Sequence, residues 1–459
     1  MKTRSFMISS ARTLAVLVLI PSALFAFGKN KVQYESLKWN FLDAPHFHVH
    51  YHQKQGDLPT TAACWMERDY AVLSKLFSFK HKDKLPLIVY GSPNLFQQTN
   101  VILELLPEGV GGFTELFKNR IVVPFNGSYQ DFRHVLHHEL VHAFMFGILY
   151  DQAGSSFFRS MGFQVPLWFA EGLAEYLSGG WNSEADMFMM DQAVHSQVPL
   201  PGPELSNYLA YKGGQSFLFF VASTRGERAF RKFLENFKAM KNVETALKET
   251  YGEDLEKLGN EWNRELKRIY WPEIGRREDP MRVAQPLTFT PKSRTNYNLR
   301  PRISPDGSKI AFFSDRKDYT RIIVTDRKGA TLTEIGQSGY GGFFESFHPF
   351  RSGVAWSPSG DRLAFVILRQ GADQLRIVTI GERRSDTTIT LGLDGLSDPD
   401  WSPDGTTIVM TGVKAGWSDL YAYDLTTGKL QRLTSDVRSE SNPRFSPDGS
   451  TIVFAAQDS

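Results

Sequence analysis

Residues 129–146 read YQDFRHVLHHELVHAFMF, and the rest of the chain is organised around this stretch. Its apolar residues recur at helical spacing, which predicts a helix. Positions four apart share one face of a helix, so His138 and His142 can offer two imidazoles to one metal ion, with Glu139 beside that face. His134 also stands four residues before His138, but no acid follows it. Only the His138 register places a carboxylate directly after the first histidine.

A second helical segment, residues 167–176, reads LWFAEGLAEY and carries two acids on an apolar background. A buried helix face disfavours carboxylates unless they meet a cation. Glu171 can supply a third metal ligand and leave the fourth tetrahedral position to water. Glu175, one turn later, can hold a ligand histidine by its free ring nitrogen. The alternative is a chance His-Glu-x-x-His match on a solvated helix, which this second motif disfavours.

Together with AYKGGQSFL at residues 210–218, these motifs resemble the gluzincin metallopeptidases. This group comprises thermolysin-like enzymes and, more closely, the aminopeptidase N family and the small peptidase MA-like bacterial domains related to it. The resemblance covers about residues 45–270. It implies that His138, His142 and Glu171 bind one zinc ion.

The resemblance also implies a reaction, the hydrolysis of peptide bonds by a zinc-activated water, with Glu139 as the general base and Tyr211 stabilising the transition state. The alternative for Tyr211 is a core tyrosine before a helix. Residues 111–115 read GGFTE where the aminopeptidases carry a Gly-x-Met-Glu-Asn strand that holds the substrate amino terminus. Glu115 is the only nearby substitute, offset in register. We therefore expect an endopeptidase.

Two histidine-bearing segments keep alternative interpretations. Residues 46–52 alternate histidine with apolar or aromatic residues, which predicts a strand with a solvated or substrate-side histidine face; the alternative is a metal-binding tract. His195 lies in a segment, residues 181–208, whose prolines and glycines predict irregular structure. Because thermolysin-like enzymes use a histidine downstream of the ligands, His195 is a candidate second transition-state donor.

Other segments predict the elements around the metal helix. Residues 61–79 predict a helix, and residues 85–90 and 120–124 predict strands. Pro124 favours an edge position for the second strand, where enzymes of the resembling family pair with the substrate backbone; the alternative is an ordinary structural strand. Further helices are predicted at 215–224, 227–240, 243–251 and 255–270, the last ended by Pro272.

The composition is that of a globular protein, with 41% hydrophobic and 22% charged residues. The 52 basic and 50 acidic residues leave no net field to attract nucleic acid or anionic lipid. Residues 1–28 carry basic residues, an apolar run and small residues, which predicts a secretory signal. The run is short for a bilayer span, so we expect cleavage, with retention as an anchor as the alternative. Cys64 is expected to be a buried hydrophobe.

A repeated motif, Ser-Pro-Asp/Ser-Gly, marks the carboxyl-terminal part of the chain. Its four copies, about 44 to 53 residues apart, occupy residues 304–307, 357–360, 402–405 and 446–449. This spacing is typical of four-stranded propeller blades, and the segment resembles the TolB-type propellers of the bacterial periplasm. The fourth repeat is short, which gives about three and a half blades. We expect further sequence or a partner to complete the arc.

The sequence therefore predicts a multidomain protein. A signal peptide at residues 1–28 precedes an α+β, zincin-like metallopeptidase domain at 29–275, a linker at 276–298 and an all-β propeller at 299–459. The predicted function is that of a zinc metallopeptidase exported to the bacterial periplasm or outside the cell, whose propeller binds a peptide or protein substrate or a cell-envelope partner.

Two other function classes stay open. One is a cell-envelope binding or scaffold protein with an inactive or structural zinc domain. The other is a zinc hydrolase acting on a non-peptide bond, since the aminopeptidase N family includes a member that opens an epoxide. Metal content measured beside peptidase activity discriminates among the three classes.

Overall fold

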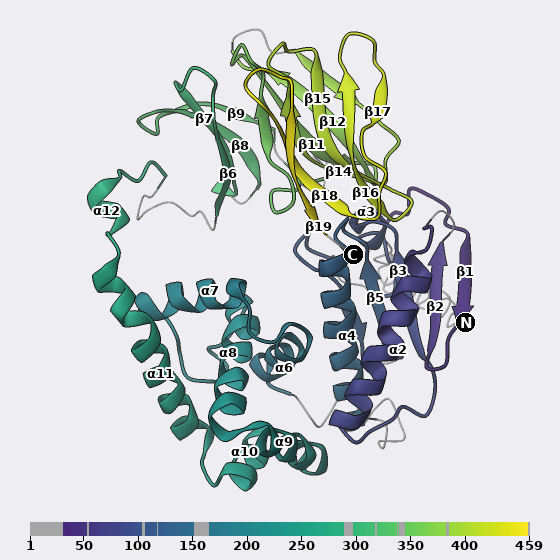
Figure 1. The fold of residues 1–459 in the computed structure, drawn as a ribbon, viewed down its shortest axis with the longest axis vertical. Coiled ribbons are helices and arrows are strands. Elements are labelled where there is room, and N and C mark those ends of the chain that lie inside the picture. The colour runs from purple at the N-terminus through teal and green to yellow at the C-terminus, as the bar shows by residue number, and fades with distance from the viewer. Residues whose placement is uncertain are drawn as a thin grey trace, which may run out of the picture.

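The computed structural model describes residues 31–457, with internal gaps. The gaps are residues 53–54, 103–105, 117, 151–164, 289–296, 317–318, 337, 339–344 and 382–384. The predicted signal segment at 1–28 and part of the predicted linker lie outside the described residues. Figure 1 shows an α+β part and a helical lobe on one side of a group of β-sheets. None of the described helices combines the length and the apolar character needed to cross a membrane.

A five-stranded sheet forms the amino-terminal part, with the strand order β1-β2-β3-β5-β4. Its strands are β1 (Trp39–Asp43), β2 (Phe47–His52), β3 (Leu85–Tyr90), β4 (Phe113–Glu115) and β5 (Arg120–Pro124). The central strands β2, β3 and β5 are parallel, while β1 and β4 are antiparallel edge strands. Helices α2 (Leu58–Leu76) and α4 (Tyr129–Tyr150) pack against this sheet, as Figure 1 shows.

The strand predicted at residues 85–90 is confirmed as β3, but the predicted edge position of the strand at 120–124 is wrong. β5 lies between β3 and β4. Pro124 is tolerated inside the sheet because it is the last residue of its strand, paired with Tyr90. The next residue, Phe125, donates its backbone N–H to the Tyr90 carbonyl at 2.8 Å, so hydrogen bonding between β3 and β5 continues past the proline.

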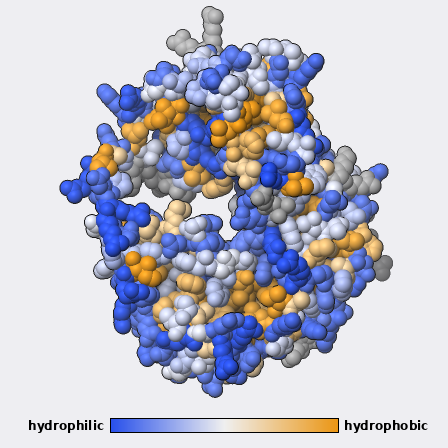
Figure 2. All heavy atoms as spheres, in the orientation of Figure 1, coloured by the Kyte–Doolittle hydropathy of each residue, from blue (hydrophilic) through white to orange (hydrophobic). Residues whose placement is uncertain are grey.

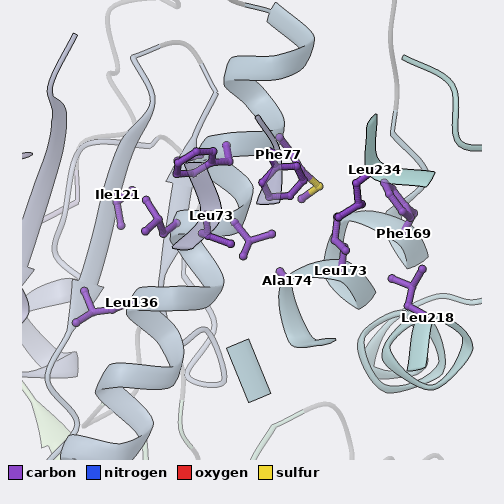
Figure 3. Packing of buried hydrophobic residues seen from close by; sticks show 14 of the residues in the cluster. Leu73, Phe77, Ile121, Leu136, Phe169, Leu173, Ala174, Leu218 and Leu234 are labelled. Carbon is purple, nitrogen blue, oxygen red and sulfur yellow. The ribbon is translucent and has the colours of Figure 1, made fainter. Parts of the chain in front are cut away.

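Further helices follow α4 and form a lobe beside it. They are α6 (Leu167–Gly179), α7 (Ser183–Val194), α8 (Tyr208–Arg225), α9 (Glu227–Met240), α10 (Val243–Tyr251), α11 (Leu255–Arg276) and the short α12 (Pro280–Val283). One apolar cluster joins the lobe to the sheet part, from Leu73 of α2 through Leu136 of α4 to Leu173 of α6 and Leu218 of α8, as Figure 3 shows. The α4 and α6 helices are therefore held against each other by a common core.

Two expectations about the lobe are wrong. Residues 183–194, expected to be irregular, form α7: Asn182 caps the helix by accepting a hydrogen bond from the Ala185 N–H, and its buried residues recur every fourth position. Helix α11 does not end before Pro272 but continues through it to Arg276. Contacts of α11 with α7 support this extension, because the Trp271 indole N–H donates to the Ala193 carbonyl at 3.2 Å.

Cys64 is exposed on α2, so the expected burial of this residue is also wrong. The apolar face of α2 that packs on the sheet is instead formed by neighbouring positions such as Ala62, Ala63 and Met66. The sequence pattern alone left the orientation of Cys64 open, because one cysteine on an amphipathic helix fits either face.

The described residues of the carboxyl-terminal part form three four-stranded antiparallel sheets and one two-stranded sheet. The first sheet contains β6 (Asn298–Ile303), β7 (Lys309–Ser314), β8 (Arg321–Asp326) and β9 (Thr331–Ile335). The second contains β10 (Val354–Trp356), β11 (Arg362–Arg369), β12 (Ala372–Thr379) and β13 (Asp386–Ile389). The third contains β14 (Gly395–Trp401), β15 (Thr407–Lys414), β16 (Trp417–Asp424) and β17 (Leu430–Arg432). The last contains β18 (Ser439–Phe445) and β19 (Ile452–Gln457).

The repeated Ser-Pro-Asp/Ser-Gly motif forms the turn between the first two strands of each sheet. In the first copy, Ser304 accepts a backbone hydrogen bond from Gly307 at 2.8 Å. Gly307 has a φ of 70°, a conformation that glycine adopts without steric cost. The Ser304 hydroxyl also accepts from the Lys309 N–H at 2.9 Å and donates to the Asp306 carboxylate at 2.6 Å. In all four copies the serine hydroxyl accepts from the backbone N–H five residues later and donates to an aspartate, which is two residues later except in the second copy, where it is Asp361. The motif therefore recurs because each turn is closed by side-chain hydrogen bonds of the same kind.

The β-sheets contact the amino-terminal part at the start of α4. The Tyr129 hydroxyl donates to the Gly416 carbonyl at 3.0 Å, and the Ser128 hydroxyl donates to Gln457 Oε1 at 2.7 Å. Ser128 also caps α4 by accepting a hydrogen bond from the Asp131 N–H. The helix with the two motif histidines thus begins at the interface between the two parts.

Candidate active site

Helix α4 supplies the two motif histidines. Most of the helix is packed inside the protein, so His138 and His142 are both more than nine-tenths buried. Four residues apart, they lie on one face, and their Nε2 atoms are 3.1 Å apart. Two ring nitrogens at this distance need a proton or a metal cation between them, because two facing lone pairs repel.

Helix α6 brings Glu171 to the same point. Its Oε2 atom lies 3.2 Å from Nε2 of His138 and 3.2 Å from Nε2 of His142. In a tetrahedral zinc site with metal–ligand distances of about 2.0–2.1 Å, neighbouring ligand atoms are about 3.3–3.4 Å apart. The triangle of two nitrogens and one carboxylate oxygen therefore has close to the dimensions of three zinc ligands.

The charge balance at this point also favours a cation. Burial opposes protonation of His138, but hydrogen bonds with Glu171 and Glu175 raise its pKa to about 10. Burial alone would raise the pKa of Glu171, but hydrogen bonds from His138 and His142 lower it to about 2. The acids around the two rings therefore attract positive charge, and a divalent metal ion can supply it.

Glu175, one turn after Glu171, lies behind His138. Its Oε1 atom is 3.2 Å from Nδ1 of His138 and 3.4 Å from Nε2 of His134. Burial raises the pKa of the Glu175 carboxyl, but hydrogen bonds from His134 and His138 outweigh it and hold the pKa well below its ordinary value. Lys212 of α8 donates to Glu175 Oε2 at 2.8 Å and is itself buried.

His134, His138 and Glu175 also lie close enough together to hold a metal ion. We interpret this group as support for His138, because Lys212 already neutralises Glu175 and because Nδ1 is the ring nitrogen that a supporting carboxylate orients. The sequence did not reveal Lys212, although it stands beside the singled-out Tyr211.

The Glu139 carboxylate is held by a residue that the sequence motifs did not include. Thr114, on the edge strand β4, places its Oγ1 atom 2.8 Å from Oε2 of Glu139 and 2.8 Å from the Glu139 backbone oxygen. Glu139 is 5% exposed, so this hydroxyl restricts a nearly buried carboxylate. A contact between residues so far apart in the chain leaves no local sequence pattern.

Tyr211 of α8 lies against the first motif histidine. Its ring stacks on the ring of His138, with 6.1 Å between centroids and 14° between planes. Burial, followed by the charges of Glu171 and Glu139, raises the pKa of the Tyr211 hydroxyl well above its ordinary value. The hydroxyl therefore stays protonated at neutral pH and can donate a hydrogen bond.

These residues line a cleft of about 930 Å³. One wall is the segment of residues 109–114, and the other is formed by α6 and α8. All six residues that the sequence singled out for the site lie along the cleft: His138, Glu139, His142, Glu171, Glu175 and Tyr211. Figure 2 shows that the surface is hollowed between the β-sheets and the helical lobe.

The first cleft wall is tied to the β-sheet part through Glu108. Its Oε2 atom accepts a hydrogen bond from the Ser346 hydroxyl at 2.8 Å, and its Oε1 atom is 3.3 Å from Nδ1 of His348. His348 is fully buried, and its Nε2 atom lies 2.7 Å from Asp373. Burial opposes protonation of His348, but Asp373 and Glu108 raise its pKa. Burial likewise opposes ionisation of Glu108, but His348 and Arg351 lower its pKa.

The remaining histidines lie outside the cleft. His195 is exposed at the end of α7, where its Nδ1 atom is 2.8 Å from the Asp191 backbone oxygen. The segment at 46–52 contains strand β2, as predicted, and His46 and His48 lie next to acids, 2.6 Å from Glu67 and 2.9 Å from Asp43 respectively. Among the described residues, the groups able to hold a metal ion contain none of these histidines.

Comparisons with known proteins match two parts of the chain. Residues 68–268 match the family model described as the Peptidase MA superfamily. Residues 292–459 match the model described as the TolB beta propeller domain. The chain thus carries a peptidase MA-like domain followed by a TolB-like propeller, which confirms the resemblance and the fold class predicted from the motifs.

Individual relatives cover smaller shares. The Tol-Pal system protein TolB of Ruthia magnifica subsp. Calyptogena magnifica is 34% identical over 18% of this chain and 19% of its own length. The uncharacterized peptidase YuxL of Bacillus subtilis (strain 168) is 32% identical over 24% of this chain and 16% of its own length. The chain therefore spans less than a fifth of these curated relatives. The crystal structure of TolB from Acinetobacter baumannii covers 36% of this chain and 38% of its own, at 22% identity and a TM-score of 0.31.

Proposed function

We propose that this chain, with its peptidase MA-like domain and TolB-like propeller, is an exported zinc endopeptidase. The observation that carries the proposal is the triangle formed by the Nε2 atoms of His138 and His142 and Oε2 of Glu171. We assign the catalytic domain to residues 29–275, the linker to 276–298 and the propeller to 299–459. The match to a periplasmic type of propeller supports export to the periplasm or beyond.

In this proposal His138, His142 and Glu171 hold the zinc ion. When bound, the ion supplies Lewis-acid chemistry and lowers the pKa of a coordinated water. Glu139 takes a proton from the attacking water and delivers it to the leaving amine, which is the work of a general base followed by a general acid. Thr114 supports this role because its hydroxyl fixes the orientation of the Glu139 carboxylate.

Three further residues, Tyr211, Glu175 and Lys212, act on charge and orientation in this proposal. The Tyr211 hydroxyl donates a hydrogen bond to the oxyanion that develops on the substrate carbonyl, and its raised pKa keeps the proton available. Glu175 fixes the ring of His138 from the Nδ1 side, and Lys212 balances its charge. Because both partners of this ion pair are buried, its geometry is well defined.

Internal cleavage is supported by the position of Glu115. This carboxylate accepts a hydrogen bond from Arg120 Nε at 2.9 Å and is not among the residues that line the cleft. It is therefore engaged elsewhere and is not placed to bind a substrate ammonium group. Among the described strands β4 is an edge strand, and its residues Phe113 and Thr114 line the cleft, so an extended substrate backbone can pair with it there.

The test is zinc content and peptide cleavage of the purified full chain beside single-residue variants. Glu139→Gln should keep one zinc ion per chain and lose activity by several orders of magnitude. His138→Ala and Glu171→Ala should lose both zinc and activity, while His195→Ala is a matched control outside the cleft. Peptide hydrolysis by Glu139→Gln at the wild-type rate would falsify the proposed mechanism.

Two results would change the assignment. Stoichiometric zinc without cleavage of any peptide in a diverse library would indicate a binding protein or a hydrolase of another bond. Cleavage that requires a free amino terminus, tested by comparing amino-blocked with free peptides, would contradict the endopeptidase assignment and not the zinc chemistry.

A further inference from the structure

A second cavity, of about 440 Å³, lies where the propeller meets the start of α4. The peptidase side contributes Asn126 and Ser128, and the propeller side contributes the first strands of three sheets, β6, β14 and β18. In Figure 1 this region is the junction between the labelled end of β18 and the upper end of α4. The cavity is thus shared by the two parts of the chain.

The repeat delivers one polar side chain from each of these three strands to the cavity. Arg300, Asp398 and Asn442 each precede a proline and each stand three residues before the repeat's Ile, Trp or Phe. All three have positive φ values, and each lies in a break of the strand register. The proline cannot donate to the ladder, so a bulge forms and re-aims the preceding side chain.

Several polar atoms in the cavity wall have no partner within the described protein. They are Oδ1 of Asp398, Oγ1 of Thr411, Oγ of Ser439 and Oε2 of Glu440. These residues are 4%, 5%, 5% and 1% exposed, respectively. Leaving a buried polar atom without a hydrogen bond is costly, so the wall is built to meet a polar group that enters the cavity.

The charges in the wall indicate the sign of that group. Arg351 is engaged by His348 and lies 3.9 Å from Glu108, and Arg300 donates to the Phe350 carbonyl. Arg300 also lies 3.9 Å from Asp398, which is too far for a hydrogen bond, so it only partly offsets the charge of this carboxylate. The carboxylates of Asp131 and Glu440 then remain without a cation in the wall, so the complementary group is positively charged.

A metal ion is a poorer match than an organic cation. The described groups of histidine, cysteine and acid residues that could hold a metal lie only in the catalytic cleft, around His138. The cavity offers instead hydroxyls and well-separated carboxylates, which suit an ammonium or guanidinium group with several donors.

The cavity and the catalytic cleft are neighbours, because Asp131 lines both. Asp131 and His138 lie on the same helix, about 10 Å apart along its axis. An extended polypeptide covers this distance in about three residues. We propose that the cavity is a subsite of the cleft that receives a lysine or arginine side chain of the polypeptide substrate, about three residues from the bond that is cut. This inference rests on the proposed function and adds the substrate feature that the propeller selects.

Peptide binding to the full-length, zinc-loaded Glu139→Gln chain tests the inference without cleavage. The probes are labelled peptides of one neutral sequence, in which a single lysine is moved along the chain, each paired with its glutamine counterpart. In one register, the lysine peptide should bind at least about tenfold more tightly than its glutamine counterpart. Adding Glu440→Gln should abolish this difference, and so should adding Asp398→Asn as a second, independent variant.

Glu334→Gln is the control, because it removes an acid from the outer strand β9 of the propeller that is not among the residues lining the cavity. It should leave the lysine preference unchanged. Unchanged binding of the glutamine peptides shows that the Glu440 and Asp398 variants are folded. Equal affinities for lysine and glutamine peptides in every register, or a preference that survives both variants, would overturn the inference and leave only a hydrated cavity. Cleavage of the neutral peptide by the wild-type chain tests the proposed function separately.

Discussion

Replacement of Gly214 by alanine tests how the candidate site is assembled. Gly214 of α8 faces Gly172 of α6, the residue after the proposed ligand Glu171. A Cβ atom added at Gly214 would lie 2.0 Å from the Trp168 carbonyl oxygen and 2.8 Å from the Gly172 Cα. Both obstacles are backbone atoms, so no side-chain rotation relieves the clash. The two helices must separate by about 1 Å before the contact becomes tolerable.

Two opposing effects determine how much Gly214→Ala lowers the free energy of unfolding. Overpacking a helix contact costs up to about 3 kcal/mol, and occasionally more. Alanine in a helix interior returns about 1 kcal/mol relative to glycine. The net loss of about 2 kcal/mol corresponds to a decrease in Tm of about 4–8 °C for a domain of this size. A shift of about 1 Å also moves Glu171 against the two histidines, which should lower the catalytic rate about 100-fold.

The neighbouring glycine provides the control. A Cβ atom at Gly213 would meet only the ends of Leu205 and Leu209, at 3.0 and 3.3 Å, and these side chains can move. Gly213→Ala should therefore keep its Tm within about 2 °C of the wild type. Thermal unfolding and zinc affinity, measured for both variants, decide the matter. A Gly214→Ala protein that melts and binds zinc like the wild type would refute the close helix crossing as the basis of the site.

Three further predictions concern residues around the cleft. Thr114→Val should lower kcat about tenfold while zinc content and KM stay unchanged, because it removes only the donor to Glu139; a fall in zinc content would point to a structural role instead. Lys212→Met leaves a buried carboxylate without its cation, so zinc affinity should fall about 10–100-fold, as measured by chelator competition; unchanged affinity would contradict the supporting role. His348→Gln should lower Tm most between pH 4.5 and 6.5. The raised pKa of His348 contributes stability that is fully present below its unfolded value of 6.5 and is lost as pH rises through the folded pKa. The lowered pKa of Glu108 contributes stability that is present above its unfolded value of 4.5 and is lost as pH falls through the folded pKa. A Tm difference independent of pH would argue against the ion pair.

The parts of the fold that could be predicted are those whose cause is local. The helix around His138 follows from a 3.6-residue pattern that needs no distant partner, and the propeller turns follow from hydrogen bonds within five residues, as in Ser304. The strand at 85–90 was predictable because an apolar run between polar segments fits a buried strand. In each case the local interactions that produce the sequence pattern also stabilise the element in the folded protein.

The errors arise where contacts between distant segments override local preferences. Helix α11 continues through Pro272 because the neighbouring Trp271 side chain hydrogen-bonds to α7. Pro124 is tolerated inside the sheet because it is the last residue of its strand. The sequence did not predict that Thr114 and Lys212 belong to the site, for a related reason. Each acts on a residue from another element, and a single hydroxyl or ammonium group at the right place has no periodicity to reveal it.

The contacts of the propeller explain how it can influence the candidate active site, although none of its described residues belongs to a group that could hold a metal ion. It holds the first turn of α4 through Tyr129 and Ser128, and it holds one cleft wall through Glu108. The first contact acts on the helix that carries His138. The second acts on the segment that leads to Thr114, whose hydroxyl contacts Glu139, the proposed general base. Because a packed helix moves as a unit, a displacement at either contact changes the ligand geometry or the orientation of Glu139. The propeller is therefore part of the framework that positions the residues of the candidate active site, and this explains why its contacts lie at the ends of the elements that carry them.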